Sequence, residues 1–187
     1  MELENKTILF LGSSVTYGSA ANGVSFADIL KDSYGVISVK EAVSGTTIAD
    51  INERSYVSRL KKVDTDMKPD LFVCQLSTND ATKKIEESKI RDGIVFIIEY
   101  AKNTFGCPIA FYTGTYYESK EYARMIDLLY DLKKEYDFLI LDLYNDEAMR
   151  KISAEDYKKY MKDPIHPNLL GYTEWWTPKF VDFLTQI

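Results

Sequence analysis

The stretch Thr7-Ile8-Leu9-Phe10-Leu11 is an apolar run that leads directly into the glycine-bounded segment Gly12-Ser13-Ser14-Val15-Thr16-Tyr17-Gly18. Four further apolar runs follow along the chain, at Val36–Val39, Leu71–Leu76, Ile109–Thr113 and Phe138–Leu143. Near-continuous apolar runs of this kind are typical of strands buried on both faces of a parallel sheet. Segments of helical periodicity separate or follow the runs, at Ala27–Asp32, Asn52–Val63, Glu87–Asn103, Tyr122–Tyr136 and Leu170–Leu184, and Pro178 predicts a kink or break in the last.

This alternation of strands and helices predicts the fold class. It implies right-handed crossovers and an α/β protein, a three-layer α/β/α sandwich around a mainly parallel five-stranded sheet. The sequence shows no internal repeat, no low-complexity stretch and no linker. We therefore expect a single domain over residues 1–187.

Composition and charge narrow the choice of partners. The 187 residues are 45% hydrophobic and 28% charged, with a formal net charge of -6. A negative chain repels phosphate backbones, so we expect no nucleic-acid partner. The apolar stretch Ile8–Leu11 is too short for a signal peptide or a membrane span, which predicts a cytoplasmic protein without membrane insertion. The oligomeric state is left open.

Ligand sites of open parallel sheets form beyond the carboxyl ends of the strands. The segments at those positions are residues 12–18, 43–47, 77–80 and 114–117. The first holds two adjacent serines, Ser13 and Ser14, but it lacks the Gly-x-Ser-x-Gly spacing of a nucleophile elbow. Such a segment can be a plain turn, a backbone anion site at a helix start, or the position of a nucleophilic serine.

The sole histidine of the chain, His166, lies three residues after Asp163 in Asp163-Pro164-Ile165-His166-Pro167. A serine hydroxyl becomes a good nucleophile when a base takes its proton and a third group orients that base. The two prolines stiffen this segment and hold both side chains in a fixed relation. The alternative is a capping aspartate beside a surface histidine, but the pattern favours an enzyme.

Two further residues have a structural and a catalytic interpretation. Asn79 follows a buried strand, so it can cap a helix, or its amide can donate a hydrogen bond to an oxyanion. Gly45 follows the second strand, where it can supply an unusual backbone angle or offer its N–H to a substrate oxygen.

Taken together, the four segments resemble the SGNH (GDSL-type) hydrolases, a family of esterases and lipases. The resemblance lies in Gly12-Ser13-Ser14 for the first motif, Gly45 for the second, Ser77-Thr78-Asn79-Asp80 for the third and Asp163 to Pro167 for the last. It spans nearly the whole chain. Ser13 and Ser77 replace the aspartate and the glycine that the family usually has, and an asparagine often found before the second-motif glycine is absent.

The resemblance implies a flavodoxin-like sandwich with Ser14 as nucleophile, His166 as base and Asp163 as the acid that orients the base. It also implies an oxyanion hole formed by the N–H of Ser14, the N–H of Gly45 and the side-chain amide of Asn79. Because Ser13 stands beside Ser14, it is a rival nucleophile, although the motif frame favours Ser14. The expected reaction is hydrolysis of a short-chain acyl ester, such as an acetyl ester, through an acyl-enzyme, with no metal or organic cofactor.

The substrate is less defined than the reaction. Six aromatic side chains are expected near the site loops: Tyr17, Tyr116, Tyr117, Tyr172, Trp175 and Trp176. Flat rings suit sugar faces, so a saccharide ester is a candidate beside small-molecule esters, but the same rings can simply fill the core. Acyl-CoA thioesterase, lysophospholipase and sugar O-acyltransferase activities are alternatives of the same fold. A non-enzymatic alternative is a flavodoxin-like module that binds phosphate at residues 12–18, although that loop has no lysine.

Overall fold

The computed structural model describes every residue from Met1 to Ile187. Its centre is a five-stranded sheet in the order β2-β1-β3-β4-β5 in which every pairing is parallel. The strands are β1 (Thr7–Gly12), β2 (Ile37–Ala42), β3 (Leu71–Gln75), β4 (Ile109–Tyr112) and β5 (Leu139–Leu141). The prediction of a parallel five-stranded α/β fold is confirmed, and the strand order is that of flavodoxin-like folds.

The three central strands are buried on both faces, which explains their continuous apolar sequence. Along β1, Leu9 and Leu11 belong to one hydrophobic core, whereas Ile8 and Phe10 belong to the other. The same alternation holds along β3 and β4, since successive strand side chains point to opposite faces. The sheet is therefore the middle layer of a three-layer sandwich.

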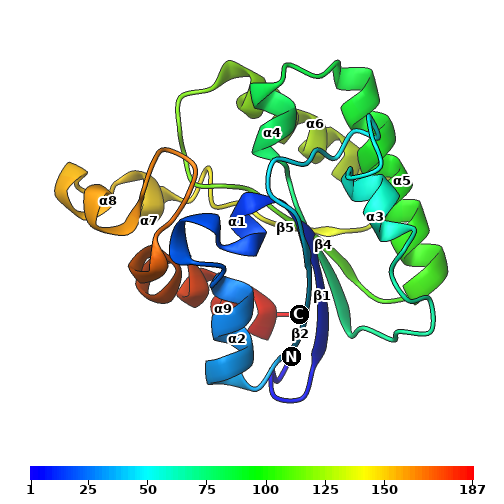
Figure 1. The fold of residues 1–187 in the computed structure, drawn as a ribbon, viewed down its shortest axis with the longest axis horizontal. Coiled ribbons are helices and arrows are strands. Elements are labelled where there is room, and N and C mark those ends of the chain that lie inside the picture. Colours follow the sequence, from blue (N-terminus) through cyan, green and yellow to red (C-terminus); the bar gives the residue numbers. More distant parts are fainter.

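Helices cover each face of the sheet (Figure 1). One core includes residues of α3 (Tyr56–Leu60), α5 (Glu87–Phe105) and α6 (Lys120–Glu135). The other includes residues of α2 (Phe26–Tyr34), of the π-helical segment η2 (Gly171–Trp176) and of α9 (Thr177–Thr185). None of the helices combines the length and the apolar character that a bilayer crossing requires.

Several short helices follow strands at the carboxyl edge or lie near it, and the sequence did not predict them. They are α1 (Ser14–Tyr17), the 3-10 turn η1 (Ser19–Ala21), α4 (Thr78–Thr82), α7 (Glu147–Arg150) and α8 (Ala154–Tyr160). Helices of four to seven residues are too short to show a helical period.

Two expected helices differ from the structure. The helix expected from Asn52 starts only at Tyr56, because the Ser55 side chain caps α3 by accepting a hydrogen bond from the N–H of Ser58 at 3.1 Å. The irregularity expected at Pro178 lies before it, in η2. Pro178 itself is in the first turn of α9, where its missing N–H costs no helical hydrogen bond.

Gly171 marks a close approach of η2 to α8. A Cβ atom at this position would lie 2.1 Å from the carbonyl oxygen of Tyr160 and 3.2 Å from Cβ of Pro167. Because the nearest atom is main chain, it cannot move aside by a change of rotamer. The glycine thus allows the carboxyl-terminal helix to pack against the segment that carries Asp163 and His166.

We expect Gly171→Ala to lower the free energy of unfolding by about 2 kcal/mol or more, because overpacking against main chain is not relieved by side-chain motion. Chemical denaturation of the purified variant measures this change. Gly114→Ala is the matched control, since its Cβ would meet only ordinary contacts at 3.7 and 3.9 Å. Equal losses in the two variants would contradict this account of the α8–η2 contact.

Candidate active site

The segment after β1 places Ser13 and Ser14 at the carboxyl edge of the sheet. Ser13 is the N-cap residue of α1, and Ser14 is the first residue of that helix. Gly12 makes the turn possible, because a Cβ there would lie only 1.7 Å from Oγ1 of Thr16. The sequence left a plain turn, an anion site at a helix start and a nucleophile position open for this segment, and the structure shows a strand-to-helix turn.

The two serines have different surroundings. The backbone N–H and the hydroxyl of Ser13 both donate to Oε1 of Gln75, at 2.9 and 3.3 Å, and Ser13 has no exposed surface. Thr16 donates to the same Gln75 oxygen at 2.8 Å. Ser14 instead retains 8% exposure, and its Oγ lies 2.8 Å from Nε2 of His166. Ser14 is thus the serine that meets the imidazole.

His166 and Asp163 are joined by a short, closed loop. Nδ1 of His166 lies 2.9 and 2.8 Å from the two carboxylate oxygens of Asp163. Oδ1 of Asp163 also accepts the backbone N–H groups of Ile165 and His166, at 2.8 and 2.9 Å. An antiparallel bridge between Met161 and Pro167 closes the loop, which is not helical. We call residues 161–167 the histidine loop.

The charge state of Asp163 determines the direction of these hydrogen bonds. Burial raises the pKa of Asp163, but the N–H groups of Ile165 and His166 and the imidazole together bring this pKa below its usual value. An ionised carboxylate only accepts hydrogen bonds, so Nδ1 of His166 carries the proton. Nε2 is then free to accept the proton of the Ser14 hydroxyl.

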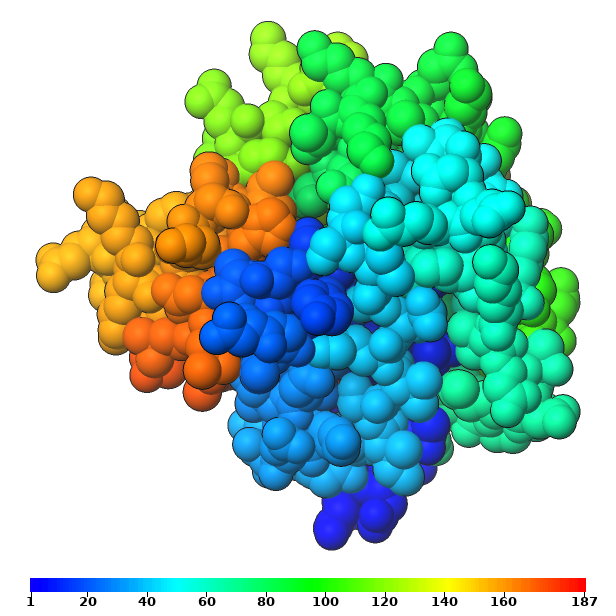
Figure 2. Space-filling model, in the orientation of Figure 1, coloured from blue at the N-terminus to red at the C-terminus, as the bar shows by residue number.

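The carboxyl-terminal part of the chain holds the histidine loop against α1. The phenol of Tyr172 donates to the backbone oxygen of Val15 at 2.7 Å, which joins η2 directly to the helix that begins at Ser14. Asn168 donates to the carbonyl of Lys159 at 2.8 Å and accepts from the N–H of Gly171 at 2.9 Å. Figure 2 shows these parts of the chain side by side on the surface. The blue amino-terminal segment lies between the orange carboxyl-terminal part and the cyan residues beyond β2.

The segments after β2 and β3 also meet. The side-chain amide of Asn79 donates to the carbonyl of Thr46 at 2.9 Å, and the hydroxyl of Ser77 donates to the same oxygen at 3.2 Å. Gly45 has φ +77°, a conformation that favours glycine, and it is exposed. The predicted pair Gly45 and Asn79 is therefore brought into adjoining segments.

Three N–H donors at this edge have no partner within the protein. The N–H groups of Ser14 and Gly45 donate no backbone or side-chain hydrogen bond. An amide side chain has two N–H donors, and Asn79 uses one of them, toward Thr46. These are the same three groups that the family resemblance implies as oxyanion donors.

Asp80 has a structural role that the sequence did not reveal. Its carboxylate has no exposed surface and accepts the backbone N–H groups of Ile48 and Ala49, at 2.8 and 3.0 Å. Burial raises the pKa of Asp80 although these hydrogen bonds oppose the rise. Asp80 thus fixes the segment after Gly45 against α4.

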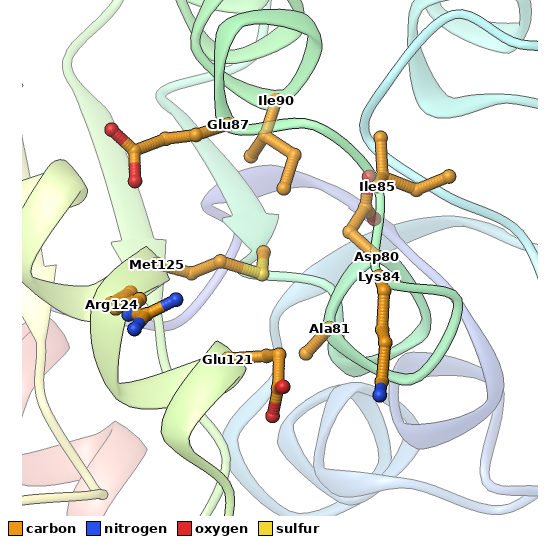
Figure 3. Close-up of a pocket in the computed structure, with 9 residues that line it drawn as sticks. All are labelled: Asp80, Ala81, Lys84, Ile85, Glu87, Ile90, Glu121, Arg124 and Met125. Atoms are coloured by element: carbon orange, nitrogen blue, oxygen red, sulfur yellow. The ribbon is translucent and has the colours of Figure 1, made fainter.

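A small cavity of about 130 Å³ lies behind Asp80, between α4, α5 and α6 (Figure 3). Its lining includes the charged side chains of Lys84, Glu87, Glu121 and Arg124. The cavity includes neither Ser14 nor His166 among its lining residues. It is therefore separate from the Ser14–His166 pair.

Arg59 is a second residue that sequence reasoning missed, because a single arginine in an amphipathic segment gives no signal. Its guanidinium is buried and donates to the carbonyl of Gly12 at 2.8 Å and to Oγ1 of Thr46 at 3.2 Å. It also donates to the carboxylate of Glu41 at 2.8 Å and to the carbonyl of Arg54 at 3.0 Å. One side chain thus links the turn that contains Ser13 and Ser14, here called the serine turn, to the segment that contains Gly45.

The aromatic residues expected near the site divide into two groups. Tyr172 and Trp176 have no exposed surface and pack on Phe26 in the core, so they offer no face to a substrate. Tyr17 and Tyr116 are exposed, and Tyr117 and Trp175 are partly so. Core packing therefore accounts for some of these rings but not for all.

The model of the GDSL-like lipase/acylhydrolase family matches residues 10–173, which include every candidate site residue. No curated protein matches the sequence.

Similar folds occur among solved structures. A protein from Lactobacillus plantarum is 18% identical with a TM-score of 0.82, and the match covers 98% of each chain. A member of the lipolytic protein G-D-S-L family from Veillonella parvula is 15% identical with a TM-score of 0.78, over 97% of this chain and 100% of that one. AlinE4, an SGNH-hydrolase family esterase, is 21% identical with a TM-score of 0.62, over 98% of this chain and 97% of that one.

We expect Arg59→Met to lower the free energy of unfolding by about 3 kcal/mol, because it leaves the acceptors on Gly12 and Glu41 without their buried donor. Arg54→Met removes the same charge from an exposed side chain, and only the backbone N–H and carbonyl of Arg54 take part in hydrogen bonds, so it is the matched control. Thermal and urea unfolding measure both. If Arg59→Met is no more destabilising than the control, the guanidinium does not hold the two segments together.

Proposed function

Because this chain belongs to the GDSL-like lipase/acylhydrolase family and is a carboxylic ester hydrolase, we propose that it cleaves short-chain acyl esters with Ser14 as nucleophile. The observation that supports this most is the continuous chain of short contacts from Asp163 through His166 to the Ser14 hydroxyl. We also propose that residues 1–187 form one hydrolase domain.

In the first step, Oγ of Ser14 attacks the ester carbonyl while Nε2 of His166 takes the hydroxyl proton. The 2.8 Å separation of these two atoms is suited to that transfer. Asp163 holds the imidazole in the tautomer that accepts at Nε2, and its negative charge stabilises the imidazolium that forms. Asp163 itself stays ionised throughout.

The tetrahedral intermediate bears a negative oxygen that needs donors. In this proposal the N–H groups of Ser14 and Gly45 and the second amide N–H of Asn79 supply them. Each is unpartnered within the protein, so no internal hydrogen bond must break to serve the oxyanion. A donor that is already oriented contributes about 3 kcal/mol to lowering the barrier.

The remaining steps reverse the proton transfer. His166 protonates the leaving alcohol as the C–O bond breaks, which leaves an acyl group on Ser14. His166 then takes a proton from water, whose oxygen attacks the acyl carbon, and Ser14 recovers its hydrogen as the carboxylic acid departs. Ester and water are consumed, and acid and alcohol are produced.

A short acyl group, such as acetyl, is the proposed substrate part, because the chain has no long apolar insertion that could cover a lipid. Family membership sets aside the non-enzymatic phosphate-binding alternative. Thioester hydrolysis, lysophospholipid cleavage, acyl transfer to a sugar and a saccharide substrate all remain untested predictions. A cytoplasmic location also remains a prediction.

We expect Ser14→Ala to abolish hydrolysis of 4-nitrophenyl acetate while the far-ultraviolet circular dichroism stays that of the wild type. Ser13→Ala should keep most of the activity, because the Ser13 hydroxyl faces Gln75 rather than His166. Steady-state release of 4-nitrophenol measures both. Loss of activity in Ser13→Ala, with activity retained in Ser14→Ala, would show that Ser13 is the nucleophile.

We expect Asn79→Ala to lower kcat by about a hundredfold with less change in KM, because the oxyanion bond strengthens as charge develops. Ser77→Ala is the matched control, since it removes another contact to the carbonyl of Thr46 without removing an oxyanion donor. Initial-rate assays over a range of substrate concentrations give kcat and KM separately. Equal effects in the two variants would show that Asn79 acts only by holding the segment.

A further inference from the structure

A second cavity lies beside the histidine loop. Its volume is about 340 Å³, at the lower end of the range for small-molecule sites. It lies between the segment after β4, helices α7 and α8, and η2, and the lining residues that carry the argument are Tyr116, Arg150, Tyr157, Lys158 and Trp175. No residue of this cavity takes part in the proposed catalysis.

We propose that this cavity binds the alcohol part of the substrate, and that this alcohol carries an anionic group, either a carboxylate or a phosphate. The proposal rests on the proposed esterase function and specifies the substrate class of that same site.

The cavity wall is in contact with the loop that carries the base. The phenol of Tyr157 donates to the carbonyl of Pro164 at 3.4 Å, and Pro164 lies between Asp163 and His166 in the sequence. The ring of Trp175 in turn meets the ring of Tyr157 edge-on, at 6.4 Å between centroids. A group bound in this cavity therefore lies next to the histidine loop.

This side of the site suits the alcohol rather than the acyl oxygen. The base that takes the Ser14 proton later protonates the leaving oxygen, so the leaving group lies on the imidazole side. Two of the three oxyanion donors, those of Gly45 and Asn79, come from the other direction, from the segments after β2 and β3. Figure 1 shows α7 and α8 on one side of α1 and those two segments on the other.

The two cations that line the cavity have no acidic partner. The guanidinium of Arg150 lies over the ring of Tyr116, 4.3 Å from its centroid, and neither Arg150 nor Lys158 forms a salt bridge. A stacked guanidinium is held in place while its N–H edge stays open, and that edge matches a carboxylate or a phosphate.

The acids nearest to Arg150 along α7 are already paired with other cations. Asp146 forms a salt bridge with Lys179 at 2.6 Å, and Glu147 pairs with Lys151. In a chain of net charge -6, an unpaired arginine and lysine at one cavity give a local positive region in a negative field. Such a region favours an anionic ligand over a neutral one.

The rest of the cavity lining is mostly apolar. Six of the nine lining residues are hydrophobic, so the body of the ligand is apolar and its charge is at one end.

Three phenyl acetates with different substituents test the proposal. They are 4-acetoxybenzoate, which carries a carboxylate, 4-acetoxyphenyl phosphate, and the neutral methyl 4-acetoxybenzoate. For each, kcat/KM is measured with the wild type, Arg150→Gln, Lys158→Gln and the control Lys120→Gln. Lys120, like Lys158, is exposed and forms no salt bridge, but it does not line the cavity.

We expect Arg150→Gln to lower the ratio of kcat/KM for the anionic esters to that for the neutral ester by about tenfold, as expected for a lost hydrogen bond to a charged group. Lys158→Gln should lower this ratio by a smaller factor, and Lys120→Gln should leave it as in the wild type. A larger change with the phosphate than with the carboxylate identifies a phosphorylated alcohol, and the reverse identifies a carboxylated one.

An unchanged ratio in Arg150→Gln, or an equal change in Lys120→Gln, overturns the assignment of the cavity. This failure is distinct from failure of the proposed function. If wild type hydrolyses the neutral ester and Ser14→Ala does not, the esterase proposal stands whatever the ratio shows. If wild type hydrolyses none of the three esters, the esterase proposal itself fails.

Discussion

All five strands of the sheet run in one direction, and this constraint brings the site together. Because parallel strands end at a common edge, the segments that follow β1, β2 and β3 meet there although they lie tens of residues apart in the sequence. The serine turn, the Gly45 segment and Asn79 each follow one of these strands. The histidine loop follows no strand. It reaches the same edge because η2 and α9 pack on the face of the sheet opposite to α5. On that face the phenol of Tyr172 donates to the backbone oxygen of Val15.

Buried polar groups turn this proximity into a fixed geometry. Gln75 at the end of β3 accepts from the turn that contains Ser13, and Arg59 on α3 donates to both Gly12 and Thr46. Asp80 accepts from the main chain that follows Gly45. None of these side chains is assigned a step in the proposed reaction, yet each restrains a segment that is. Such restraint lets donors and acceptors hold their positions before the substrate arrives, which is the main source of electrostatic catalysis.

Much of this arrangement could be predicted from the sequence, for identifiable reasons. The apolar runs of β1, β3 and β4 are continuous because these strands are buried on both faces, whereas the edge strands β2 and β5 are only partly buried. A lone histidine three residues after an aspartate, in a chain with a serine turn, indicated a catalytic pair. The positions of Arg59 and Asp80 could not be predicted, because their partners are main-chain atoms, which leave no pattern. The short helices α7 and α8 could not be predicted either, since four and seven residues do not establish a period. The cavity beside the histidine loop depends on those helices and was therefore hidden as well.

The central claim is that Ser14 is a nucleophile activated by His166. The most direct measurement is covalent labelling of the folded wild-type protein with a fluorophosphonate, followed by digestion and fragmentation mass spectrometry that separates Ser13 from Ser14. The account predicts one adduct, on Oγ of Ser14, and none in His166→Ala over the same time. An adduct on another residue, or equal labelling without the imidazole, would contradict it.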